Sequence, residues 1–384
     1  MMNRRFRKPV KRAGAENNQL ITLVAFAVTV VGVRIYLEAT GYPQIGNGVL
    51  HIAHLLWGGL LLFIAMLLPL LIANRWVYKL GALLGGIGVG LFIDEVGKFI
   101  TRSNDYFFPF AAPIIYGFFM LVLLLYVEVR KPSQHDSRAE LYHALDQIME
   151  LIENDLDDRE RSDLEARLRR VIVDPEYPEH ARLAEALLAV IDSDTLPIAA
   201  DPAPTIIRRF IGLLEALEQR FLTEARYRAL LIIGLAVAGV GLMIEFIVYV
   251  SALIAPGMLR LSITTLLVSP NIAGPSSLRW FVVLIVLTGI VGLMFLLGDA
   301  LLFLHRDKIG SEISYLGLLI ALTIVNLLLF YFNQFAAVGT TLWEFALIIA
   351  LLRYRYVYLG VGANINVLTR LAHGSITPEA AFSE

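Results

Sequence analysis

The sequence predicts an all-α polytopic membrane protein in which eight transmembrane helices, four and four, flank a small cytoplasmic helical insert. Three observations support this fold class. The 384 residues are 57% hydrophobic and only 17% charged, whereas soluble domains carry about 25% charged residues. Eight apolar windows can each cross a hydrocarbon core of about 30 Å, and an acidic segment separates the fourth from the fifth. This composition excludes an ordinary soluble enzyme, and the absence of cysteine excludes disulfides and thiolate chemistry.

The eight windows and the basic residues between them predict the topology. The windows lie near residues 20–38, 49–73, 79–100, 110–129, 228–253, 279–304, 312–333 and 339–353. Lysine and arginine gather in the N-terminal tail and then at every second connection, and such clusters mark the cytoplasmic side. We therefore expect a multi-pass protein of a bacterial inner membrane, with both termini in the cytoplasm.

The acidic segment, residues 131–227, has a different composition from the rest of the chain. It holds 21 of the 34 acidic residues and 12 of the 32 basic ones, a local charge of −9. Leu141, Leu145 and Ile148 repeat at helical spacing, which predicts a helical domain. The predicted layout is a basic cytoplasmic tail (1–19), spans one to four with an outward-facing polar site (20–130), the insert with a juxtamembrane helix (131–227), spans five to eight (228–360) and a cytoplasmic tail (361–384).

Residues 205–222 carry a heptad-like apolar seam that leads into the fifth span. Such a seam is typical of a helix that forms a homodimer, and equally of a helix packed against its own insert. The net charge of −2 gives no indication of a nucleic-acid partner. The bilayer is the one partner that composition alone predicts.

Ionisable residues inside the spans are the strongest functional signal, because each is costly in hydrocarbon unless it is paired or hydrated. We expect one ligand or ion site, made of Arg34, Glu38, His51, His54, Asp94, Glu95, Lys98 and Glu245. Asp94, Glu95 and Lys98 are its catalytic candidates. With Glu344 added, the charges at this depth sum to −3 when histidine is neutral, so a converged site needs protons or a cation.

Residue spacing supports convergence in the first three spans. Arg34 and Glu38 share a face at i,i+4, and so do Asp94 and Lys98. The third span carries two stripes of small residues, one leading to Glu95 and the other to Asp94. Small residues at this spacing let helices approach closely, so both carboxylates are expected to face other helices.

Three kinds of chemistry fit such a site. His51, His54 and Glu95 could hold a divalent metal such as zinc with an open position for water, which would make the protein a membrane hydrolase. Buried Asp, Glu, His and Lys also form the relays of ion-coupled or proton-coupled transporters. The third interpretation is an ion-pair network in a non-catalytic scaffold or sensor. The sequence therefore leaves open whether the protein is an enzyme.

Residues 45–130 resemble VanZ-like and YjdF-like bacterial membrane proteins in the order of their features. His51 and His54 open one span, and Asp94-Glu95-Val-Gly-Lys98 follows near the end of the next. Asn104-Asp105 comes after it, and then Ala111-Ala112-Pro113 leads to Gly117. Lys98 stands at a different spacing from the family's basic residue. The resemblance implies a role in the cell envelope, with a lipid or cell-wall precursor as ligand.

Overall fold

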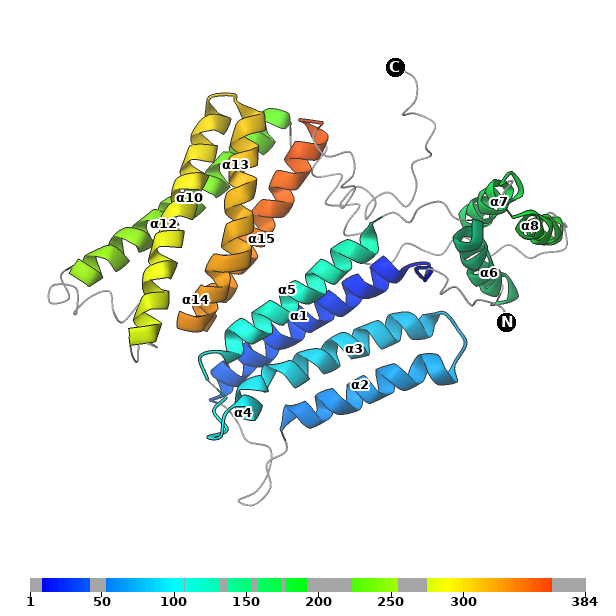
Figure 1. Ribbon diagram of the computed structural model, residues 1–384, viewed down its shortest axis with the longest axis horizontal. Coiled ribbons are helices and arrows are strands. Elements are labelled where there is room, and N and C mark those ends of the chain that lie inside the picture. Colours follow the sequence, from blue (N-terminus) through cyan, green and yellow to red (C-terminus); the bar gives the residue numbers. More distant parts are fainter. Residues whose placement is uncertain are drawn as a thin grey trace, which may run out of the picture. The chain divides into compact units, whose positions relative to one another are not determined.

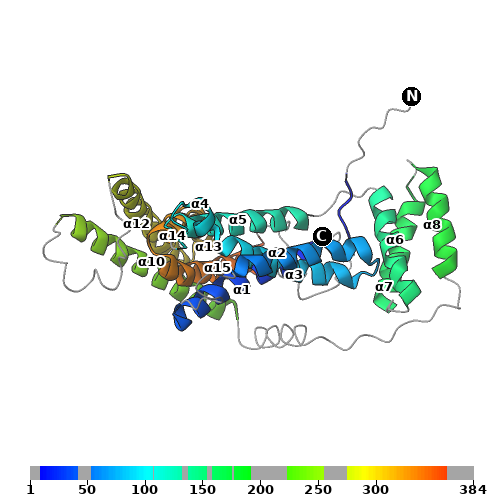
Figure 2. The same ribbon diagram turned by 90° about the horizontal axis from the view of Figure 1, so that it is seen from below.

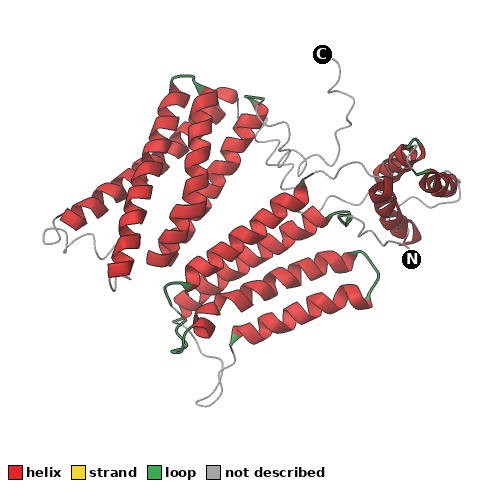
Figure 3. Cartoon of the chain, viewed as in Figure 1, coloured by secondary structure: helices red, strands yellow, loops and turns green. Residues whose placement is uncertain are grey.

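The computed structural model describes residues 9–41, 53–106, 108–131, 137–153, 158–174, 177–191, 223–254 and 275–360. These segments are helices and short loops without a strand (Figure 3). Within them, the helices long and apolar enough to cross a membrane number eight: Ala15–Thr40, His54–Leu71, Trp76–Asp94, Ala111–Arg130, Glu224–Ser251, Pro275–Phe303, Asp307–Phe332 and Ala336–Val357. The all-α, eight-span prediction is confirmed, and the chain is a multi-pass membrane protein.

The chain divides into two compact units, and the first contains residues 1–95 and 119–203. Its membrane helices are α1 (Ala15–Thr40), α2 (His54–Leu71), α3 (Trp76–Asp94) and the second half of α5 (Ala111–Arg130). Helix α3 lies between α1 and α2 and packs against both (Figure 1).

The two glycine stripes of α3 explain this close packing, because each stripe faces a different neighbour. An added Cβ at Gly86 would lie 2.5 Å from the Thr22 carbonyl oxygen of α1. An added Cβ at Gly88 would lie 2.9 Å from the Gly58 carbonyl oxygen of α2. The Thr22 hydroxyl also donates a hydrogen bond to the Ala82 carbonyl of α3. Small residues thus let three backbones meet at van der Waals distance.

The insert contributes α6 (Ser137–Glu153), α7 (Asp158–Ile172) and α8 (Pro178–Ile191) to the first unit. Figure 2 shows these three helices packed side by side. Leu164, Leu168 and Ala184 are fully buried among them, whereas Leu145 and Leu183 are exposed. The predicted seam at 205–222 lies outside the described residues.

The second unit contains residues 96–118 and 204–384. Its helices are α4 (Val96–Ile100), the first half of α5, α10 (Glu224–Ile254), α12 (Pro275–Phe303), α13 (Asp307–Ile320), the π-helical turn η1 (Ala321–Val325), α14 (Asn326–Phe332) and α15 (Gln334–Val357). Leu284, Phe295 and Leu318 are buried at the centre of this bundle. Gly298 of α12 and Gly310 of α13 bring those two helices together.

Candidate functional site

The principal polar site, the Arg34 site, consists of Arg34, His54, Asp94 and Glu95. It lies at one end of the first unit, where three helices meet. Arg34 is near the C-terminal end of α1, His54 is the first residue of α2, and Asp94 is the last residue of α3. Glu95 follows directly, at the break between α3 and α4. Helices α1 and α3 run parallel and α2 runs antiparallel to both, so these positions fall at the same end of the bundle. The predicted single span at 79–100 is thus interrupted where its acidic pair stands.

Two ion pairs from different helices meet on Asp94. The Arg34 Nε atom donates a hydrogen bond of 2.7 Å to one Asp94 carboxylate oxygen. The His54 Nε2 atom lies 3.3 Å from the other oxygen. The Asp94 side chain is 0% exposed, so both partners replace water that the carboxylate has lost. This geometry ties α1 and α2 to α3 through one carboxylate.

His54 also faces the second acid, since its Nδ1 atom lies 3.6 Å from a Glu95 carboxylate oxygen. A neutral imidazole has one N–H and can donate to only one of these two carboxylates. An imidazolium can donate toward both. The His54 ring therefore bridges the two buried acids at the start of α2.

The three contacts given above involve none of the other predicted members of the site. Glu38 is exposed one turn beyond Arg34, and no described residue forms an ion pair with it. Lys98 belongs to the second unit, where its ammonium lies 5.4 Å from the centre of the Tyr106 ring. Glu245 also belongs to the second unit, on α10. His51 lies outside the described residues.

The zinc interpretation depends on His51, which lies outside the described residues. In the described segments, no group of three or more His, Asp or Glu side chains has the geometry of a metal site. The Arg34 Nε atom lies 2.7 Å from one oxygen of Asp94, so a metal bound to that carboxylate would be repelled by the nearby guanidinium. A zinc site made of His51, His54 and Glu95 stays a prediction.

Sequence reasoning missed a second polar cluster, in the second unit. The Asn326 amide of α14 donates a hydrogen bond of 2.7 Å to the Glu344 carboxyl of α15, and both side chains are buried. Tyr116 of α5 interacts with the same amide. A lone asparagine within the apolar run Ala321–Phe332 was the available signal, because polar groups in a membrane span need partners.

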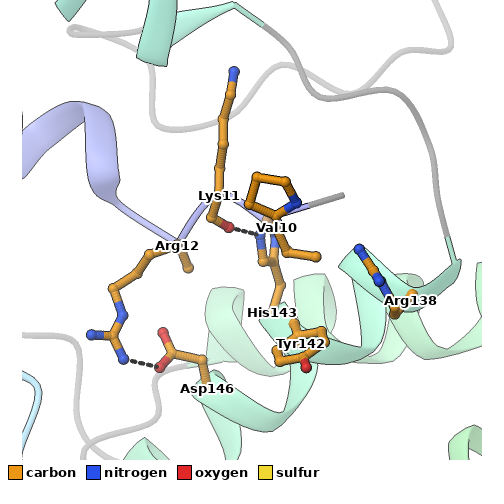
Figure 4. Close-up of a pocket in the computed structure, with 9 residues that line it drawn as sticks. Val10, Lys11, Arg12, Arg138, Tyr142, His143 and Asp146 are labelled. Carbon is orange, nitrogen blue, oxygen red and sulfur yellow. Dashed lines mark hydrogen bonds and ion pairs between the residues drawn. The ribbon is translucent and has the colours of Figure 1, made fainter. Parts of the chain in front are cut away.

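A third feature joins the N-terminal segment to the insert. A cavity of about 410 Å³ lies between residues 9–13 and α6, and Figure 4 shows the side chains that line it. The Lys11 carbonyl meets the His143 ring at 2.9 Å, and Asp146 lies 3.7 Å from both Arg12 and Arg75. The Lys11 ammonium donates to carbonyls at the end of α5, which is a favourable place for a cation. This junction holds the insert at the end of the unit opposite the Arg34 site.

Asp146→Asn is expected to loosen this junction, because it weakens both ion pairs at once. Each partly exposed pair contributes about 0.2–1 kcal/mol, so we expect trypsin to cleave around α6 about two- to tenfold faster. Limited proteolysis of the purified protein measures this rate. Asp163→Asn, a change at an exposed aspartate of α7, is the matched control. Equal cleavage rates of the two variants would contradict the conclusion that Asp146 holds the insert at this junction.

Comparison of the chain with family models, with curated proteins and with solved structures finds no match. Its functional interpretation therefore depends on the geometry of its own residues.

Proposed function

We propose that this multi-pass membrane protein binds the anionic head of a lipid or lipid-linked ligand at the Arg34 site, in the cell envelope. The observation that carries the proposal is that the two acidic side chains of the site are more deeply buried than the two basic ones. Asp94 and Glu95 are 0% and 1% exposed, whereas Arg34 and His54 are 11% and 23% exposed. A ligand entering the site meets the Arg34 and His54 side chains before it meets the two acids. The acids lie behind them and orient them, as carboxylates do for functional histidines.

The surroundings favour a ligand with an apolar tail. Ile35, Tyr36, Leu56, Trp57 and Phe92 stand on the same helical turns as the site, and all five are exposed. In a bilayer these side chains would contact acyl chains, and tryptophan and tyrosine favour the level of the lipid headgroups. An anionic head at Arg34 and His54 would leave its chains against this apolar surface.

Two sequence expectations agree with this proposal. The distribution of basic residues places the Arg34 end on the outer side of the membrane. The resemblance of residues 45–130 to VanZ-like proteins suggests a cell-envelope role, in which lipid-linked cell-wall precursors are plausible ligands. A catalytic role for Asp94 or Glu95 would require a substrate to displace the donors that cover them.

The test is a binding experiment with the full chain in nanodiscs of zwitterionic lipid. Dihexanoyl phosphatidic acid is the probe, and dihexanoyl glycerol, which lacks the phosphate, is its matched control. We expect Arg34→Gln and His54→Gln to weaken binding of the phosphatidic acid about tenfold each, because each removes one hydrogen bond to a charged group. Isothermal titration calorimetry measures the affinities.

Arg102→Gln, a change at an exposed arginine outside the site, is expected to bind like the wild type. Equal binding by the Arg34 and Arg102 variants would overturn the proposal. In that case the scaffold interpretation, in which these residues form only a structural ion-pair network, would be favoured. Proton-coupled uptake into proteoliposomes that is lost in Asp94→Asn would favour the transporter instead.

A further inference from the structure

The second unit contains a buried acidic cluster that the lipid-head proposal does not use. Glu344 of α15 is 2% exposed and receives its hydrogen bond from Asn326, which is 0% exposed. Glu245 of α10 lies close enough to Glu344 for the two carboxyls to interact electrostatically. Of the described residues, no lysine, arginine or histidine pairs with either carboxyl. Two acids therefore meet in an apolar bundle, and the described part of the chain offers neither of them a basic partner.

The backbone next to this cluster departs from α-helical geometry. Residues 321–325 form a π-helical turn between α13 and α14, directly before Asn326. Wider turns of this kind interrupt the regular carbonyl ladder and are frequent at functional sites. The Tyr116 hydroxyl donates a hydrogen bond to the Leu322 carbonyl in this turn. A distorted turn and a buried tyrosine thus support the asparagine that holds Glu344.

Two further polar groups, the Asn326 amide and the Thr341 hydroxyl, belong to the surroundings of Glu344. The Asn326 side-chain oxygen and the Thr341 hydroxyl are buried, and neither has a hydrogen-bond partner among the described residues. Asn326 Oδ1 belongs to the amide that holds Glu344, and Thr341 precedes Glu344 by one helical turn. Buried polar groups are ordinarily satisfied; these two oxygens are polar features of the packing around Glu344, outside the lining of the cavity.

A cavity of about 310 Å³ leads to the two carboxyls. Val237, Leu242 and Trp343 form its apolar walls, and Thr340, Glu245 and Glu344 supply its polar groups. Val237 and Trp343 are exposed, so the cavity opens at the surface of the bundle. This volume is at the lower end of the range for small-molecule sites.

We propose that this cavity binds a lipophilic organic cation, a substituted ammonium with a compact apolar body. The carboxyls supply the countercharge, the aliphatic walls accept the apolar body, and the Trp343 indole offers a cation–π contact. A bare metal ion fits less well, because most of the wall cannot coordinate it. A neutral acyl chain would fill the apolar part but would give no countercharge to Glu344, which is buried, or to Glu245, which is partly buried.

The experiment compares two isosteric probes on the purified full chain in detergent, by saturation-transfer NMR and calorimetry. Benzyltrimethylammonium carries the charge, and neopentylbenzene has a carbon in place of the nitrogen. We expect the cation to bind the wild type about tenfold more tightly than the neutral probe, and Glu344→Gln to remove most of this difference. Glu245→Gln is expected to act in the same direction.

Gly241→Leu tests the cavity without touching its charges. Gly241 lines the cavity, and an added Cβ there would meet no atom within 4 Å. The leucine should fill the cavity and abolish binding of the cation while the helices stay folded. Gly59→Leu on α2, where an added Cβ also meets nothing within 4 Å, is the matched control and should bind normally.

Unchanged binding of the cation in both Glu344→Gln and Gly241→Leu would overturn the proposal. Equal affinity for the two probes would overturn it as well, because it would identify a purely apolar groove. If Glu344→Gln fails to fold, Glu245→Gln and Gly241→Leu still decide the outcome.

Discussion

Asp94→Ala is expected to lower the free energy of unfolding by about 3–5 kcal/mol, because removing one partner of a buried ion pair leaves the other charge uncompensated. The Arg34 guanidinium is 11% exposed and would lose a hydrogen bond of 2.7 Å. His54 would lose one of its two carboxylate neighbours. Denaturant titration in bicelles, followed by circular dichroism, measures the loss.

Two further variants separate this effect from a general sensitivity of the helix ends. Glu38→Ala removes an exposed carboxylate from the same end of the bundle and is expected to change stability by less than about 0.5 kcal/mol. The double variant Arg34→Met/Asp94→Leu removes both charges and should recover most of the lost stability. If Asp94→Ala lowers the free energy of unfolding no more than Glu38→Ala does, the ion pair between Arg34 and Asp94 does not hold α1 against α3.

The ion-pair partner of Arg34 could not be predicted from the sequence. Glu38 stands four residues from Arg34 on the same helix, and the spacing alone makes it an equally good partner. The structure pairs Arg34 with Asp94 because α3 ends at the level of Arg34. Glu38 lies one turn further along α1, beyond the end of α3, and is exposed. Such a choice depends on where a neighbouring helix ends, which spacing within one helix cannot show.

The acidic residues of the later spans show a second limit. Hydropathy gives the depth of Glu245 and Glu344 in the membrane, and depth alone suggested one site with the acids of the third span. Depth does not give the direction in which a side chain points, so it could not show that the two carboxyls share one cavity or that Asn326 donates to Glu344. The π-helical turn before Asn326 has no sequence signal either, since its residues are as apolar as their neighbours.

The glycines of α3, by contrast, were informative in the sequence because their spacing alone defines two faces of one helix. Gly86 and Gly90 face α1, and Gly88 faces α2. The same stripes lead to Asp94 and Glu95, which contact Arg34 of α1 and His54 of α2. Close packing therefore sets the distance at which the polar groups meet.

Gly58→Ala is expected to destabilise the first unit by about 1–3 kcal/mol, because the new methyl group would overpack the contact between α2 and α3. An added Cβ at Gly58 would lie 2.8 Å from the Gly88 carbonyl oxygen and 2.9 Å from the Phe92 amide nitrogen. Both are backbone atoms, so only a shift of the whole helix relieves the clash. Bicelle denaturation again measures the effect.

Gly59→Ala is the control for this variant, one residue away on the same helix. Its added Cβ would meet nothing within 4 Å, so only helix propensity changes, which favours alanine by about 1 kcal/mol. His54 stands one turn before Gly58, and a shift of α2 moves its ring away from Asp94 and Glu95. Gly58→Ala should therefore also weaken binding of dihexanoyl phosphatidic acid, whereas Gly59→Ala should not. Equal stability and equal binding in the two variants would contradict the close contact of α2 with α3 and, with it, the geometry of the Arg34 site.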